Sequence, residues 1–264
     1  MVVSGAMQPA KAQIVDAAAT HLDGVRFRRS VSGPESDLIE RFLEAYQPDL
    51  HPSCDTTVFR EPWLASGAPD LVVVVWHTPT TVEWLDARLA VSARDVKLVQ
   101  LLVSNGPTPT PDFKRLGGVS AEKSLNRLES AGLVRRASGS WRARSLRRSF
   151  AVRKIIALEA KIGDWQRALV QAAVNRWFAS ESYILIDRMP RNSRASEEAR
   201  AIDVGIWVDG EPAPRQKPAS VLRQPLSYTS WLFNEWCWRD ARSKGGQGIL
   251  PSDGRSGLAG GEVS

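Results

Sequence analysis

The sequence is poor in cysteine and has no long apolar run. Cys54 and Cys237 are the only cysteines among 264 residues, too few for a disulfide framework or a thiolate zinc site, and they favour a reducing, intracellular setting. The longest unbroken apolar run, residues 71–76, is far shorter than the ~20 residues that a membrane-spanning helix requires. The first ten residues lack the basic and apolar regions of a secretory signal. We therefore expect a cytoplasmic protein.

Histidine is also scarce, and the three histidines show no metal-ligand spacing. Internal repeats are absent. With 43% apolar and 24% charged residues, the composition is that of a globular protein of one large domain or two small ones, which excludes collagen, mucin and wholesale disorder. Residues 241–264, with seven glycines and no apolar periodicity, predict a disordered tail.

Basic residues are concentrated in one part of the chain. Residues 94–154 contain 14 Lys or Arg and 4 Asp or Glu, a net charge of +10, whereas the whole chain carries +6 and the remainder therefore −4. Such asymmetry is typical of a protein in which one module meets a polyanion.

Helical and extended patterns alternate outside this basic segment. Apolar residues at three-to-four spacing predict helices over residues 10–22 and 35–46, and the apolar run over 71–76 predicts a buried central strand. The other expected elements are strands at 56–60, 154–162, 182–187 and 204–209 and helices at 164–177 and 196–201. This mixture predicts an α/β fold with a mixed central sheet flanked by helices, built from residues 1–92 and 151–240.

The basic segment has a pattern of its own. Three short helices precede a hairpin, which is the order of a winged helix. The expected elements are helices at 95–104, 111–116 and 121–131, the last capped by Ser120, and hairpin strands at 133–136 and 141–144. We therefore expect residues 93–150, the insert, to form a winged helix between two strands of the sheet.

Three charged residues occupy segments that otherwise look buried. Asp70 lies immediately before the apolar strand, and Glu159 and Lys161 interrupt the apolar run of the next core strand. Positions two apart in a strand share a face, so Glu159 and Lys161 project together. Burial of such charges is unfavourable unless they pair or bind a cation.

These residues resemble the signature of the PD-(D/E)XK nuclease superfamily. Residues 69–70 match its Pro-Asp and residues 159–161 match its Glu-x-Lys. Gln171 matches a helix glutamine of several branches and is a candidate catalytic residue, whereas Asn175 stands where the exonuclease-like branch has Tyr. The resemblance covers roughly residues 35–210 with the insert removed, and it implies a restriction-endonuclease-like sheet.

The resemblance also implies a Mg²⁺ or Mn²⁺ site. Asp70 and Glu159 would be carboxylate ligands, and oxygen ligands suit these cations. Lys161 would orient the attacking water or stabilise the transition state. Some members carry a further metal-binding Glu on the first helix, here Glu40 or alternatively Glu44, and Glu61 is another candidate. All of these rank below Asp70 and Glu159.

The insert predicts a DNA-binding surface. Its third helix exposes Lys123, Asn126 and Arg127, which we expect in the major groove beside an arginine wing. The wing residues are Arg135, Arg136, Arg142 and Arg144, followed by Arg147 and Arg148. A solvated face or a protein contact is the alternative for such a charge run.

Together these patterns predict a metal-dependent DNA endonuclease in which Asp70, Glu159 and Lys161 hydrolyse a phosphodiester while the insert holds the duplex. Cutting both strands would require two active sites, hence a homodimer or a partner. The alternative is a winged-helix transcriptional regulator with a catalytically inactive nuclease-like domain, in which Glu159 and Lys161 form a structural ion pair.

Overall fold

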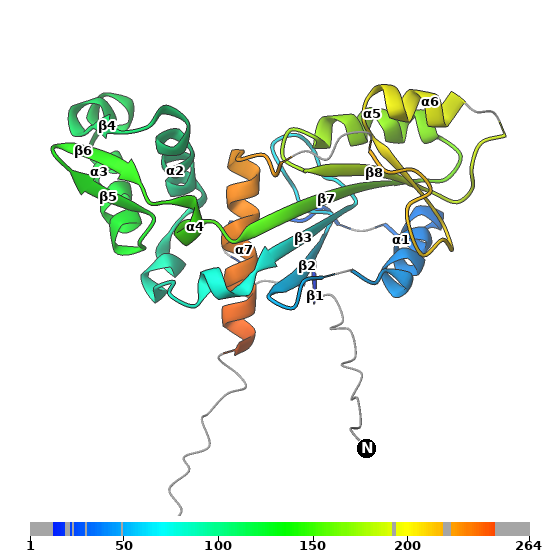
Figure 1. Cartoon of the computed structure of the whole chain (residues 1–264), viewed down its shortest axis with the longest axis horizontal. Coiled ribbons are helices and arrows are strands. Elements are labelled where there is room, and N and C mark those ends of the chain that lie inside the picture. Colours follow the sequence, from blue (N-terminus) through cyan, green and yellow to red (C-terminus); the bar gives the residue numbers. More distant parts are fainter. Residues whose placement is uncertain are drawn as a thin grey trace, which may run out of the picture.

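A mixed six-stranded sheet forms the centre of the molecule (Figure 1). The computed structural model describes residues 13–18, 22, 24–29, 31–48, 50–191, 194–218 and 223–245. In spatial order the strands are β1 (Gln13–Val15), β2 (Cys54–Arg60), β3 (Leu71–His77), β7 (Val152–Lys161), β8 (Glu181–Ile186) and β9 (Gly205–Val208). Strands β2, β3 and β7 are antiparallel neighbours, whereas β1 runs parallel to β2, and β8 and β9 continue in parallel from β7. The predicted central position of β3 is confirmed.

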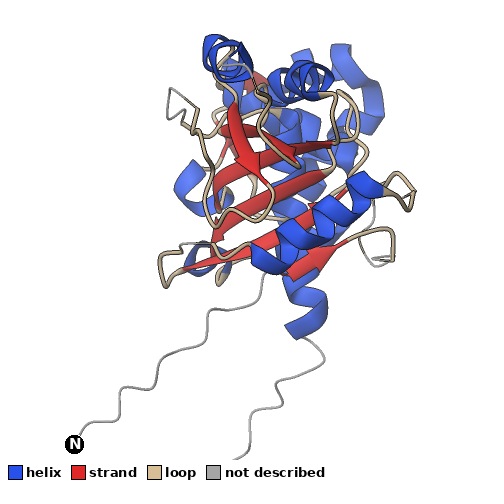
Figure 2. Ribbon diagram, turned by 90° about the vertical axis from the view of Figure 1, so that its right-hand side faces the viewer, coloured by secondary structure: helices blue, strands red, loops and turns tan. Residues whose placement is uncertain are grey.

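Helices cover both faces of this sheet (Figure 2). On one face lies α1 (Pro34–Ala45), whose Leu38 joins a buried cluster with Leu71 and Leu158. The other face carries α5 (Trp165–Asn175), α6 (Arg194–Ala201) and α7 (Tyr228–Gly245). The predicted mixed α/β class with a flanked central sheet is therefore confirmed. Among the described helices, none is long and apolar enough to cross a membrane.

The insert forms one end of the molecule (Figure 1). The 3₁₀ helices η1 (Thr78–Thr81) and η2 (Asp86–Ala90) lead from β3 toward it. Its elements are α2 (Ala93–Asn105), β4 (Thr108–Pro109), α3 (Thr110–Ser130), β5 (Val134–Ala137), β6 (Ser140–Ala143) and α4 (Leu146–Ser149). The hairpin prediction is confirmed, because Ser138 and Gly139 both have positive φ, 50° and 75°, as a two-residue turn between twisted strands requires.

Two helix predictions are wrong. Residues 13–15, inside the helix expected over 10–22, form strand β1, because pairing with β2 and burial of Val15 outweigh the helix propensity of this alanine-rich stretch. The helices expected at 111–116 and 121–131 are one helix, α3, so Ser120 is no N-cap. Glycine in a helix interior costs about 1 kcal/mol relative to Ala, and burial of Phe113, Leu125 and Leu128 offsets that cost.

Helix α7 was not predicted at all. It extends to Gly245, so residues 241–245 of the expected disordered tail are helical, and the rest of that tail lies outside the described residues. Trp231, Trp236 and Trp238 are buried on this helix, where the first two pack in the main core. They contribute to the core of this chain.

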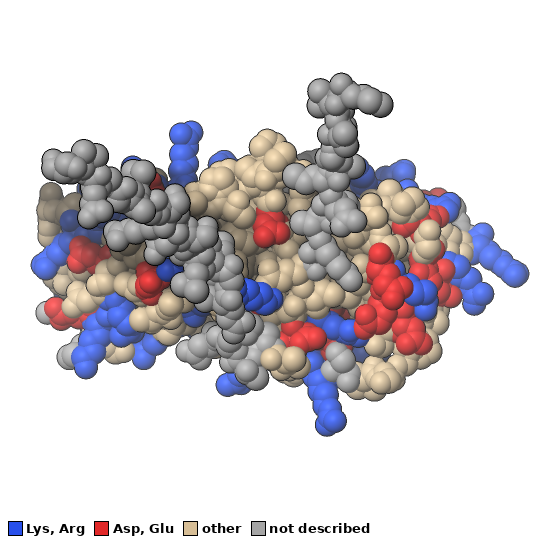
Figure 3. Space-filling model, turned by 90° about the horizontal axis from the view of Figure 1, so that it is seen from below, with Lys and Arg blue, Asp and Glu red and all other residues tan. Residues whose placement is uncertain are grey.

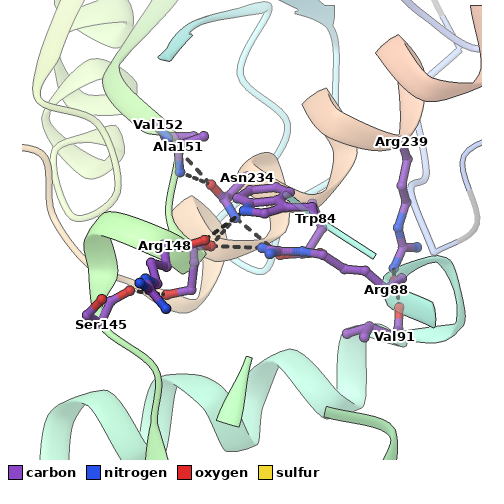
Figure 4. A network of polar contacts seen from close by, with 11 residues as sticks. Trp84, Arg88, Val91, Ser145, Arg148, Ala151, Val152, Asn234 and Arg239 are labelled. Atoms are coloured by element: carbon purple, nitrogen blue, oxygen red, sulfur yellow. Dashed lines mark hydrogen bonds and ion pairs between the residues drawn. The ribbon is translucent and has the colours of Figure 1, made fainter. Parts of the chain in front are cut away.

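A buried polar network joins the insert to α7 (Figure 4). Arg88 forms a two-point ion pair with Glu235, at 2.6 and 2.8 Å, and its guanidinium lies over the ring of Trp84, with 3.3 Å between Cζ and the ring centroid. Arg88 Nη2 also donates to the carbonyl of Ser149 at the far end of the insert, and Asn234 Nδ2 donates to the same carbonyl. Both ends of the insert are therefore fixed to one helix.

Candidate active site

Strands β3 and β7 bring Asp70 and Glu159 together. The antiparallel register pairs Leu71 with Leu158. One position beyond this pair, Asp70 lies opposite Glu159. Asp70 Oδ2 accepts a 2.8 Å hydrogen bond from the backbone N–H of Ala160. The two carboxylates that the sequence singled out therefore share one edge of the sheet and one of its faces.

Glu159 is almost fully buried, with 3% of its surface exposed. Its Oε1 accepts a 2.7 Å hydrogen bond from Asn175 Nδ2 on α5. Burial, and after it the negative charge of Asp70, raises the pKa of Glu159 to about 8, and the Asn175 hydrogen bond opposes this rise. Without a neutralising cation, Glu159 therefore holds a proton at neutral pH.

A small cavity adjoins Glu159. Its volume is about 130 Å³, and its walls are the loop before β3 and one side of α5. The lining residues are Ser66, Gly67, Ala68, Pro69, Glu159, Val170, Gln171, Val174 and Asn175. Gln171 Oε1 is buried and accepts no hydrogen bond from the described part of the chain. Gln171 therefore lines the same cavity as Glu159, and its catalytic role stays a prediction.

Lys161 lies at the same edge but does not pair with Glu159. Its Nζ donates a 2.8 Å hydrogen bond to Oε2 of Glu35, in the first turn of α1. The positive charge of Lys161 nevertheless acts on both site carboxylates, because it lowers the pKa of Asp70 and that of Glu159 against the larger effect of burial. The structural ion pair considered between Glu159 and Lys161 is therefore wrong.

Glu61 also belongs to this region, through Arg28. Arg28 donates from Nε to Glu61 Oε2 at 2.7 Å and from Nη2 to Asp70 Oδ1 at 2.8 Å. Glu61 has a φ of 50°, which is uncommon outside glycine, while its N–H donates to the carbonyl of Asp70. This backbone geometry turns the Glu61 carboxylate toward the guanidinium. The guanidinium thus bridges two buried carboxylates.

Glu40 takes no part in this cluster. Its carboxylate pairs with Arg60, and about half of its side chain is exposed. The α1 residue that does reach the site is Glu35, through Lys161. Among the described residues, no group of three or more His, Cys, Asp or Glu is gathered closely enough to hold a metal ion. Any cation here would rest on the pair of Asp70 and Glu159 with backbone or water oxygens.

Sequence reasoning missed the roles of Arg28, Glu35 and Asn175. Asn175 was recoverable, because it follows Gln171 by four residues on the same helix and so faces the same strand. Arg28 carried no signal, since it lies in a segment without periodicity. That segment reaches the site because Phe27 bridges to Pro62, next to Glu61.

The residues predicted to contact DNA lie on two neighbouring parts of the insert. Lys123 and Asn126 are exposed on α3. Arg127 instead donates two hydrogen bonds, of 2.8 and 3.1 Å, to the buried carboxylate of Asp95 on α2. Its guanidinium therefore also joins α3 to α2.

The wing arginines, by contrast, are exposed on the hairpin. Arg135 and Arg142 are directly opposite each other in its register, so their side chains share a face, and Arg144 follows two residues on from Arg142. Within the described chain none of these three forms an ion pair with a carboxylate. Arg136 lies nearer the ring of Trp141, with 6.0 Å between Cζ and the ring centroid.

On the face that Figure 3 shows, Asp and Glu side chains gather near the end that carries α1 in Figure 1, whereas Lys and Arg side chains project from both ends. Comparison with known protein families, with curated proteins and with solved structures gives no match to this chain.

Proposed function

We propose that this protein is a metal-dependent DNA endonuclease of the PD-(D/E)XK type. The observation that carries the proposal is the pairing of Asp70 with Glu159 across β3 and β7, with Lys161 two residues further along β7 at the same sheet edge. The surrounding order, α1, β2, β3, β7, α5 and β8, agrees with the restriction-endonuclease-like fold once the insert is removed. The position of the triplet on adjacent core strands supports the proposal more than the short sequence pattern does by itself.

The residues at this edge fit a hard divalent cation. Asp70 and Glu159 offer only oxygen donors, and their mutual repulsion in a buried site is the strain that a Mg²⁺ or Mn²⁺ ion would relieve. When bound, such an ion lowers the pKa of a water ligand and neutralises charge on a phosphate. Asn175 would hold the carboxylate of Glu159 in place, and Lys161 would stabilise charge that develops on the phosphate.

The insert supplies the matching surface for a duplex. Helix α3 and the hairpin of β5 and β6 support the interpretation of the insert as a winged helix, with Lys123 and Asn126 toward the bases and the wing arginines toward the phosphates. The unpaired cross-strand arginines are more simply understood as phosphate contacts than as structural ones.

The test is cleavage of supercoiled plasmid in Mg²⁺, in Mn²⁺ and in EDTA. We expect nicking or linearisation that needs the metal and is lost in Glu159→Ala and Lys161→Ala. Arg200→Gln is the control, because Arg200 is an exposed arginine of α6. The wild type and all three variants should shift the same DNA on a gel. Metal-independent cleavage, or cleavage by both site variants, would contradict the proposal.

One observation favours a second candidate, a DNA-binding regulator on an inactive nuclease scaffold. Arg28 already neutralises Asp70 and Glu61, as a permanent substitute for a metal would. In that case every protein in the plasmid assay would bind DNA and none would cut it.

A further inference from the structure

The guanidinium of Arg28 lies where a cation is needed. It is within hydrogen-bond distance of both Asp70 and Glu61, whose side chains are 9% and 8% exposed. Two carboxylates so far from water require a positive charge nearby. Asp70, however, is also one of the two carboxylates proposed to hold a divalent cation.

The Arg28 side chain is open to solvent on its far side. It is 45% exposed, far more than the side chains of its two partners. It also lines a second cavity, of about 470 Å³, whose other walls include Arg29, Arg60 and Ser36. The Arg28 side chain thus lies between the two carboxylates on one side and, on the other, an open cavity whose charged walls are Arg29, Arg60 and Asp16. The backbone of Arg28 is held by a hydrogen bond from its N–H to the carbonyl of Glu61. Release of Asp70 therefore requires a movement of the side chain alone.

We propose that Arg28 is a built-in competitor of the divalent cation: it neutralises Asp70 and Glu61 in the metal-free protein and must release Asp70 before a metal ion binds. This inference rests on the proposed function, because it takes Asp70 and Glu159 as the metal ligands. It adds a positioning residue that the sequence signature does not contain. Arg28 sets how readily the site accepts a metal.

The size of the effect depends on the fraction of time for which Arg28 leaves Asp70 unpaired. A binding-competent state that is populated for only about one-tenth of the time weakens the apparent affinity about tenfold. Removing Arg28 should therefore strengthen metal binding, although it removes a side chain from the site. If Arg28 only supported the fold, its removal would weaken metal binding or leave it unchanged.

The experiment is calorimetric titration of the full chain with MnCl₂ at pH 8, without DNA. We expect Arg28→Gln to bind Mn²⁺ about tenfold more tightly than the wild type. Arg28→Lys keeps the positive charge and should stay close to the wild type. Arg26→Gln is the matched control, because it removes an equal charge from another exposed arginine of the same segment, one that lines neither cavity. Unchanged or weaker binding in Arg28→Gln would overturn the inference.

Glu61→Gln tests the same competition from the other partner and decides the question if Arg28→Gln does not fold. Loss of the Glu61 charge loosens the hold on Arg28, so Mn²⁺ should again bind more tightly. Weaker binding would instead make Glu61 a metal ligand and overturn the inference. Absence of Mn²⁺ binding in the wild type and in every variant would overturn it as well.

Plasmid cleavage separates this inference from the proposed function. Competition between Arg28 and Mn²⁺ without cleavage would leave the inference standing and remove the nuclease. Cleavage that depends on Glu159, with an unchanged Mn²⁺ affinity in Arg28→Gln, would support the nuclease and overturn the competition by Arg28.

Discussion

Asn175 on α5 and Glu159 on β7 are joined by a buried 2.7 Å hydrogen bond from Nδ2 to Oε1. This contact holds a carboxyl group whose pKa is about 8, raised first by burial and then by the charge of Asp70. The helix thus fixes the direction of a group whose protonation changes close to neutral pH. The chemistry of the site should therefore depend on pH.

The first prediction concerns stability. The folded protein keeps the Glu159 proton up to about pH 8, whereas the unfolded chain releases it near pH 4.5, so the free energy of unfolding falls as pH rises between these values. Glu159→Gln cannot release a proton there. We expect the variant to match the wild type near pH 4.5 and to exceed it by about 2–4 kcal/mol at pH 8. Urea unfolding across this range is the measurement, and a constant difference between the proteins would contradict the expectation.

A second prediction concerns the hydrogen bond itself. Asn175→Ala removes a donor that favours the ionised form of Glu159, so the pKa of Glu159 should rise further. NMR titration of ¹³C-labelled glutamate side chains reports this pKa directly. Gln171→Ala is the control, because Gln171 lines the same cavity without a hydrogen bond to Glu159. Equal titration curves for the wild type and Asn175→Ala would show that the contact has no electrostatic effect.

The third prediction concerns the wing. Arg135 and Arg142 oppose each other across the hairpin, and like charges in that position destabilise it. Arg142→Gln should raise the free energy of unfolding by about 0.5 kcal/mol while it weakens DNA binding. The slope of log K against log[salt] should fall by about 1 for the lost phosphate contact. Arg200→Gln, far from the insert, should leave the slope unchanged.

The fourth prediction concerns the network on α7. Glu235→Ala leaves the buried guanidinium of Arg88 without its carboxylate, which should cost about 3–5 kcal/mol of stability. The double variant Arg88→Met, Glu235→Leu removes both charges and should recover most of that loss. Chemical denaturation measures both effects. A double variant as unstable as Glu235→Ala would assign the stability to the other hydrogen bonds of Arg88.

Local patterns were sufficient to predict much of the fold. The apolar run of β3, Pro34 at the start of α1 and the turn residues of the hairpin each determine their structure within a few residues. Local patterns also singled out Asp70 and Glu159 as charges in otherwise apolar strands, whereas their proximity was expected only from the resemblance to the nuclease superfamily. Helix α7 was not predictable in this way, since apolar residues occur around much of its circumference and no single stripe marks it.

The rest of the site depends on contacts between distant segments. Arg28 lies 42 residues from Asp70 in the sequence, and Glu35 lies 126 residues from Lys161. No sequence spacing predicts either contact, because the fold of the intervening chain determines whether the two residues meet. Strand β1 shows the same limit, because alanines on both sides of Ile14 and Val15 favour a helix, and pairing with the neighbouring edge of β2 made the segment extended.

The anchoring of the insert on α7 also fixes an order of events during synthesis. Residues 93–150 leave the ribosome well before Glu235, which holds Arg88, and before Asn234, which holds Ser149. Until α7 emerges, the buried network through Glu235 and Asn234 cannot form. Completion of α7 therefore adds the buried contacts that fix the insert in place, and a chain that stops before Tyr228 would lack them altogether.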